Sequence, residues 1–248
     1  MGKYIGLKDS YKSLIEALCH GGIANGVEVC IEWVDSDTLL KKSSLELLSK
    51  SHAILIPGGF GERGISGKIL AANYARKYQI PFLGICLGLQ IAIIEVMKNV
   101  VGYKDSGSSE FGAYKHLVVG LLKEWDNKGK KEIRSNTDVK GGTMRLGSYE
   151  CVLEKGSKAF DIYKNKIIQE RHRHRYEVNI NYEKVLRKVG IIFSGKSPDG
   201  LLPEIIEIEN HPWFIGVQFH PELKSSPLQP HPIFASFIKA ALRQSRLV

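Results

Sequence analysis

The sequence predicts one α/β domain over residues 1–248, with a mostly parallel central sheet flanked by helices. Short apolar runs alternate with longer helical patterns through residues 1–101, which is the order of a sheet built from β-α-β units. The apolar run 80–85 has the composition of a strand buried on both faces, and the apolar segment 87–101 is long enough for a buried helix. A chain of 248 residues can close a sizeable core within one domain.

The first part of the chain divides at turn and capping residues. Asp9 and Ser10 are typical helix N-caps, and Gly21 with Gly22 is expected to end the helix that follows them. The expected elements, in order, are a strand stub over 3–7, a helix over 11–20, a strand over 27–34, a short helix ending at 48, a strand over 53–56, a helix over 66–78, and the strand and helix over 80–85 and 87–101.

Periodicity fades over residues 102–147. The part from 126 to 142 is rich in Lys, Gly, Asn and Asp, which predicts a mobile surface insertion rather than a second domain. Later expected elements are short strands over 149–153, 167–170, 191–194, 203–209 and 214–219, a helix near 182–189, and an amphipathic helix over about 233–246.

Composition narrows the class of protein. Four cysteines without paired spacing indicate free thiols in a reducing cytoplasm rather than a disulfide framework. The net charge of +9 is explained first by solvated faces and second by an anionic ligand; nucleic acid is not expected, because basic residues are not interleaved with aromatic ones. No membrane segment is expected, since Gln90, Glu95 and Lys98 interrupt the most apolar run.

Residues 190–197 match the phosphate-loop pattern G-x-x-x-x-G-K-[ST] letter for letter. That site needs a loop of free amides followed by a helix N-terminus. Here the pattern begins with strand-forming residues and leads through Pro198, Asp199 and Gly200 into another β-type run, so a hairpin is predicted in its place.

Cys86 stands at the expected turn between strand 80–85 and helix 87–101. Gly84 and Gly88 flank it at minus two and plus two, which gives the G-x-nucleophile-x-G elbow with cysteine in place of serine. A thiol at a helix N-terminus is favoured as the nucleophilic thiolate. The alternative is a buried cysteine acting as a small hydrophobe, and the spacing alone favours neither.

A cysteine nucleophile needs a base, and His220 follows an apolar run whose carboxyl end should lie at the same edge of the sheet as Cys86. Glu222, beyond Pro221, could accept a hydrogen bond from the imidazole and fix its tautomer. Taken alone, the segment is also explained as an ordinary turn after a strand.

Three other histidines compete with His220. His172 and His174 lie in the basic stretch 171–175, which is most simply explained as a solvated strand edge; metal binding there is not expected without carboxylate or cysteine partners. His211 is the third.

The Pro57-Gly58-Gly59 turn follows an expected parallel strand, so its amides could face the cleft beside Cys86. The N–H groups of Gly59 and Leu87 could together form an oxyanion hole. A purely structural turn explains the glycines equally well.

Segments 84–90 (GICLGLQ) and 218–222 (QFHPE) resemble the class I, or triad, glutamine amidotransferases, in which cysteine, histidine and glutamate hydrolyse glutamine. Further segments resemble the glutaminase half of the CTP synthetases. They are 2–5 (GKYI), 9–13 (DSYKS), 57–64 (PGGFGERG), 109–111 (SEF), 141–147 (GGTMRLG), 171–179 (RHRHRYEVN) and 211–213 (HPW). The resemblance implies a flavodoxin-like fold with a small additional antiparallel sheet.

The resemblance also implies roles for particular residues. Cys86 would be the nucleophile, His220 the general base and acid, and Glu222 the carboxylate that orients it, with Gly59 and Leu87 as oxyanion donors. The residues implied to hold the glutamine are Gln90, Glu110, Arg175 and Tyr176. Those implied near a GTP effector are Phe60 and Arg63, and segment 141–147 would be a lid.

For the whole enzyme, the resemblance implies an amino-terminal synthetase domain on the same polypeptide that uses ATP and magnesium, allosteric activation by GTP, and a tetramer. No cofactor or metal is expected in this domain. The family's first strand begins before residue 2, so this chain is expected to be an excised carboxyl-terminal domain. Two other functions stay open: a γ-glutamyl hydrolase or cysteine peptidase, although such peptidases usually have histidine where Leu87 stands, and a non-catalytic glutamine-binding module.

Overall fold

A mixed seven-stranded sheet forms the centre of the molecule. The computed structural model describes residues 1–2, 8–39, 42–121 and 144–247. In spatial order the strands are β1 (Ile54–Ile56), β2 (Phe82–Ile85), β10 (Phe214–Val217), β9 (Pro203–Ile208), β8 (Ile191–Lys196), β5 (Arg145–Leu153) and β6 (Ile167–His174). β1, β2 and β10 run parallel, and the pairs from β10 to β6 are antiparallel. The α/β class is confirmed, with parallel pairing confined to one end of the sheet.

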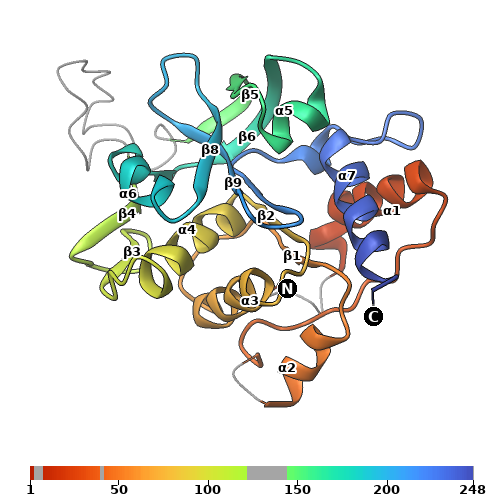
Figure 1. The fold of residues 1–248 in the computed structure, drawn as a ribbon, viewed down its shortest axis with the longest axis horizontal. Helices are drawn as coiled ribbons and strands as arrows, with labels where there is room; N and C mark the ends of the chain where they lie inside the picture. The colour runs from red at the N-terminus through yellow and green to blue at the C-terminus, as the bar shows by residue number, and fades with distance from the viewer. Residues whose placement is uncertain (3–7, 40–41, 122–143, 248) are drawn as a thin grey trace.

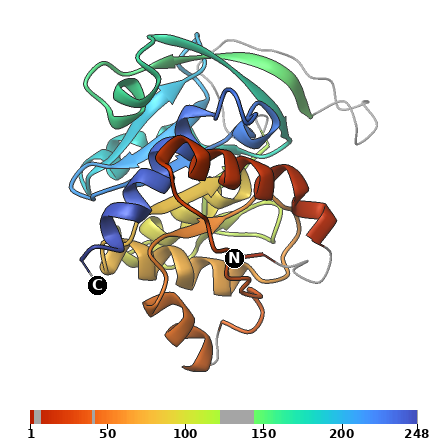
Figure 2. The same ribbon diagram turned by 90° about the vertical axis from the view of Figure 1, so that its right-hand side faces the viewer.

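Helices cover both faces of the parallel part of the sheet. On one face, α3 (Ile65–Lys77) packs beside α4 (Leu87–Asn99); on the other, α1 (Lys12–Asn25) packs beside α7 (Pro232–Gln244) (Figures 1 and 2). Strand alternation divides the core between these layers: Phe82 joins the α4 side, whereas Leu83 joins the α7 side. This is why β2 is apolar at every position.

Shorter elements connect these layers. They are η1 (Lys8–Tyr11), α2 (Lys42–Ser49), α5 (Lys158–Tyr163), η3 (Ile180–Tyr182), α6 (Glu183–Arg187) and η4 (Pro221–Leu223). None of the helices in the described ranges is both long and apolar enough to cross a bilayer.

A second, smaller sheet contains β3 (Ser106–Ser108), β4 (His116–Gly120) and β7 (Glu177–Val178). β3 and β4 are parallel and β4 and β7 antiparallel, so the expected small sheet is present and is mixed. β7 anchors the residues that directly follow Arg175 and Tyr176.

The first long helix is longer than expected. It runs through Gly21 and Gly22 to Asn25, and Gly26, with φ of 64°, follows it in the left-handed conformation. Gly21 is needed for packing, because a Cβ there would lie 2.8 Å from the carbonyl oxygen of Phe234 in α7. The expectation that this glycine pair ends the helix was therefore wrong.

Residues 27–34, which were predicted to form a strand, pair with no strand among the described residues. Side-chain exposure alternates along the segment, but its backbone hydrogen bonds to described residues occur only at its two ends. The Val27 N–H donates to the Gly22 carbonyl, and the Val34 carbonyl accepts the N–H of Gly2, each at 3.1 Å. The predicted strand over 3–7 and most of the predicted insertion over 126–142 cannot be compared, because residues 3–7 and 122–143 lie outside the described residues.

The phosphate-loop pattern at 190–197 forms a hairpin, as predicted. Gly195 and Lys196 lie within β8, and Ser197 closes the turn to β9 by donating its N–H to the Leu202 carbonyl at 2.9 Å. Gly195 packs tightly, since a Cβ there would lie 2.7 Å from the sulfur of Cys151.

Candidate active site

Cys86 occupies the turn between β2 and α4 in a backbone conformation that cysteine rarely adopts. Its φ is 53° and its ψ is −103°. Glycines make the turn feasible, because a Cβ on Gly88 would lie 2.2 Å from the Ile56 carbonyl oxygen and one on Gly84 would lie 2.6 Å from that of Gly88. Such strain costs about 1–3 kcal/mol and persists only where the surrounding structure enforces it. The elbow places the sulfur at the N-terminus of a thirteen-residue helix.

His220 lies next to this elbow because β10 pairs in parallel with β2, so the two strands end at the same edge of the sheet. Its Nδ1 is 2.7 Å from Oε1 of Glu222, which sits in the short turn that begins at Pro221. A Cβ on Gly58 would lie 2.8 Å from Cε1 of His220 and 3.6 Å from Cβ of Cys86. Glycine at position 58 therefore leaves room for the two side chains to meet.

The His220 imidazole is stabilised in its charged form. Burial acts to lower its pKa, but hydrogen bonding to Cys86 and to Glu222 outweighs burial and raises the pKa to about 10. Nε2 is buried and makes no hydrogen bond of ordinary geometry to a described residue, and Cys86 contributes the largest of the raising interactions. The histidine therefore carries a proton between a sulfur and a carboxylate.

The two residues expected to supply the oxyanion donors, Gly59 and Leu87, are neighbours in space. A Cβ on Gly59 would sit 3.4 Å from Cδ2 of Leu87. Neither N–H donates a backbone hydrogen bond to another described residue, so both amides remain available to a ligand.

Gln90, one helical turn beyond Cys86, faces the same site. Its Nε2 donates to the Tyr176 carbonyl at 3.0 Å and to Oε1 of Gln218 at 3.2 Å. Nε2 of Gln218 in turn lies 3.7 Å from Sγ of Cys86. The sequence did not lead us to predict Gln218 as a site residue. The signal was its position two residues before His220 at the end of a strand, because such residues project to the same side.

The remaining expected site residues lie on the turns around this centre. Oε1 of Glu110 accepts the N–H of Gly61 at 2.7 Å, which ties it to the glycine-rich loop. Arg175 is half-buried, and its guanidinium has no hydrogen bond or ion pair with any residue in the described part of the chain. Phe60 is 68% exposed and Arg63 pairs with Asp37 at 3.1 Å, so both lie on the outer surface of the loop.

A cluster of buried ionisable groups lies behind the site. Arg145 of β5 contacts Glu204 at 2.8 Å and Glu177 at 3.3 Å. His172 and His174 of β6 are joined at 2.9 Å between Nδ1 and Nε2, and each also faces one of the two carboxylates. The expectation that these histidines lie on a solvated edge was wrong.

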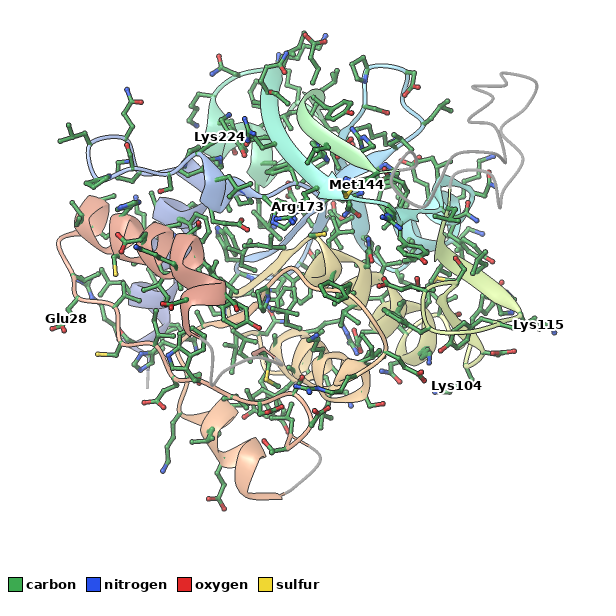
Figure 3. The ribbon with its side chains drawn as sticks, turned by 180° about the vertical axis from the view of Figure 1, so that it is seen from behind. Glu28, Lys104, Lys115, Met144, Arg173 and Lys224 are labelled. Atoms are coloured by element: carbon green, nitrogen blue, oxygen red, sulfur yellow. The ribbon has the colours of Figure 1, made fainter. Side chains whose placement is uncertain are left out.

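Strand alternation explains the error. The even-numbered residues of β6 are buried, and the arginines between them face solvent. Figure 3 shows one of them, Arg173, near Met144, the residue directly before β5. Burial, together with the charges of Arg145 and His220, lowers the pKa of His172 to about 3. Burial raises the pKa of Glu204 to about 7 despite the opposing effect of Arg145.

Two further observations concern metal sites and cavities. Among the described residues, no group of three or more His, Cys, Asp or Glu side chains is arranged to hold a metal ion. A cavity of about 640 Å³ lies between α1, α7 and segment 27–33, and its lining includes neither Cys86 nor His220.

Comparisons with known proteins show which family this chain is similar to. The family model of the class-I glutamine amidotransferases matches residues 6–240. The CTP synthases of Maricaulis maris and Zymomonas mobilis are each 58% identical over the whole chain, which spans 46% of their length. The glutaminase domain of CTPS from Trypanosoma brucei, solved with bound acivicin, is 38% identical with a TM-score of 0.85, and the alignment covers 98% of this chain and 92% of that one.

Proposed function

Because the chain belongs to the class-I glutamine amidotransferases, and within them to the glutaminase domains of CTP synthases, we propose that it hydrolyses glutamine to glutamate and ammonia. The observation that carries the proposal is the position of His220, hydrogen-bonded to Glu222 at 2.7 Å and adjacent to the strained elbow of Cys86. A cysteine, a histidine and a carboxylate in this order are the groups that acyl transfer through a thioester requires.

In the first half-reaction the Cys86 thiolate attacks the side-chain amide carbon of glutamine. The N–H groups of Gly59 and Leu87 stabilise the negative oxygen of the tetrahedral intermediate. The His220 imidazolium gives its proton to the departing nitrogen, so that ammonia leaves and a γ-glutamyl thioester remains on Cys86.

In the second half-reaction the neutral His220 removes a proton from water, which attacks the thioester. The carbon–sulfur bond breaks, glutamate leaves and the thiolate is restored with His220 protonated again. Glu222 stabilises the imidazolium in both halves. One glutamine and one water give one glutamate and one ammonia.

The ends of glutamine are assigned to the flanking turns. The Arg175 guanidinium, without an ion-pair partner in the described structure, suits the α-carboxylate, and Glu110 suits the α-ammonium. Gln90 and Tyr176, which are hydrogen-bonded to each other, complete the proposed glutamine-binding surface, called here the substrate wall. Acivicin bound to the Trypanosoma brucei domain supports a pocket for an amino acid.

At the level of the whole enzyme, ammonia would pass to a synthetase domain that converts UTP to CTP with ATP and magnesium. We place a GTP effector near Phe60, whose exposed ring can stack on a base, and Arg63, whose charge can meet phosphate. We also propose a homotetramer in the cytoplasm and no cofactor within this domain.

The proposal is tested by glutamate release from glutamine. Cys86→Ala should abolish it, whereas Cys19→Ala, Cys30→Ala and Cys151→Ala should retain most of it. Cys19 and Cys30 are exposed, and burial raises the pKa of Cys151 far above the neutral range, so that thiol is unreactive. Turnover by Cys86→Ala would overturn the assignment, and an inactive wild-type chain that still binds glutamine would indicate a binding module.

A further inference from the structure

Gln218 is fully buried and lies within hydrogen-bonding distance of the nucleophile. Its Nε2 is 3.7 Å from Sγ of Cys86, and its exposed fraction is 0%. No step of the mechanism above uses it. A buried amide costs free energy unless its donors and acceptor are paired, so its partners indicate its role.

The direction of the Gln218 amide is fixed by its neighbours. The carbonyl oxygen of Tyr176 can only accept a hydrogen bond, so Gln90 must present its NH₂ group to it. The second hydrogen of that NH₂ group meets Oε1 of Gln218 at 3.2 Å. With its oxygen engaged by Gln90, Gln218 must direct an N–H at the sulfur.

We propose that Gln218 is a positioning residue that donates a hydrogen bond to the Cys86 thiolate, and that Gln90 holds it in this orientation from the Tyr176 backbone. The thiolate thus has two donors, the His220 imidazolium and the Gln218 amide. A donor that stays in place when His220 gives up its proton keeps the sulfur aligned between the two half-reactions.

The chain of hydrogen bonds from Tyr176 through Gln90 and Gln218, called here the relay, also connects Cys86 to the substrate wall. Tyr176 follows Arg175, and its carbonyl accepts from Gln90 and lies 3.2 Å from Nδ1 of His174. The backbone N–H of Gln218 donates to the Glu204 carbonyl at 2.8 Å, so both ends of the relay rest on the buried cluster. The inference rests on the proposed function only in taking Cys86 as the nucleophile.

The test measures alkylation of each cysteine by iodoacetamide as a function of pH, with peptide mass spectrometry to separate the sites. Gln218→Glu keeps the shape and the acceptor for Gln90 but removes the donor; Gln218→Met removes both. In each variant, the midpoint of the pH profile of the Cys86 alkylation rate should move up by about one pH unit.

Asn179→Asp is the matched control, since it converts another buried amide, which donates to the Leu117 carbonyl at 3.1 Å, without touching Cys86. Its Cys86 profile should equal that of the wild type. Cys151, fully buried, reports folding, because it becomes alkylated only if the structure opens. Gln218→Met, which adds no charge, decides the question if Cys151 stays protected, whereas Gln218→Glu also places a carboxyl group beside the sulfur.

An unchanged Cys86 profile in a folded Gln218 variant would overturn the inference. If instead wild-type Cys86 reacts no faster than Cys19 and Cys30, the nucleophile assignment itself fails. The two failures are therefore distinguishable without any substrate.

Discussion

His220 lies between Cys86 and Glu222, and both neighbours favour the charged form of its imidazole. Burial alone would favour neutral imidazole, yet Cys86 and Glu222 together raise the pKa to about 10. At neutral pH the resting site therefore contains His220 as the imidazolium. His220 is charged and positioned before glutamine binds.

Removal of the sulfur should release that proton more easily. In Cys86→Ala, the largest raising interaction is gone while burial still acts, so the pKa of His220 should fall below the wild-type value. Histidine NMR titration measures this directly. A Cys86→Ser variant is the comparison, because it keeps a hydrogen-bonding atom in place; an unaltered His220 pKa in Cys86→Ala would show that the two side chains are not coupled.

Glu222 and His220 should differ in their effect on turnover. His220→Ala removes the group that moves the proton and should lower kcat by about 10²–10⁴-fold, as general acid–base groups do. Glu222→Gln keeps a side chain of the same shape at Nδ1 and should cost less. Steady-state glutamate release compares them. A larger loss in Glu222→Gln would assign Glu222 a role other than orientation.

At the scale of elements, β6 places two histidines in the interior with pKa values well below their ordinary range. The unfolded chain binds protons at these positions below about pH 6.5, whereas the folded chain does not, so acid favours unfolding. Glu204 opposes this between about pH 4.5 and 7, because its raised pKa makes the folded state hold a proton. The combined effect of the two histidines on folding stability is larger than the opposite effect of Glu204.

Folding stability should therefore drop by roughly 2 kcal/mol between pH 6.5 and 4.5. His220 contributes little to this window, since its raised pKa adds stability that is present below pH 6.5 and lost only as pH rises toward 10. Urea unfolding at both values measures the drop. His172→Asn, which cannot titrate, should remove much of the slope, and an equal slope in that variant would exclude His172 as its source.

An element could be predicted from the sequence where residues close to it in the sequence determine its conformation, and not where distant residues do. The Cys86 elbow could be predicted from the glycine spacing together with the strand and helix patterns on either side of it. The hairpin at 190–197 could be predicted from the strand-forming residues around it. The continuation of α1 through Gly21 depends on the backbone of α7, more than two hundred residues away. The alternation that buries His172 was hidden, because basic residues on one face of β6 masked the cluster on the other.

At the scale of the whole molecule, the basic residues are dispersed. Lys104 and Lys115 lie toward the small sheet, whereas Lys224 and Arg173 lie elsewhere on the surface (Figure 3). This arrangement fits solvated faces better than one polyanion-binding surface. The expected and observed folds agree where β1, β2 and β10 converge, and they differ where pairing depends on residues distant in sequence.

This chain should release ammonia without using it. The one phosphate-loop pattern in the sequence is built into the β8–β9 hairpin, so it cannot cradle a nucleotide phosphate. Given glutamine, ATP, magnesium and UTP, the protein should produce glutamate and no CTP. Chromatography of the nucleotides, against a reaction without enzyme, measures this; a CTP peak would reveal a nucleotide site elsewhere in the chain.

Covalent labelling with a diazoketone analogue of glutamine tests most directly whether Cys86 attacks the glutamine side chain. Mass spectrometry of the digested protein should locate one adduct on the peptide containing Cys86, and excess glutamine should slow its formation. Cys19 and Cys30 serve as exposed controls. An adduct on those residues with none on Cys86, or labelling of Cys86 that glutamine does not slow, would contradict the account.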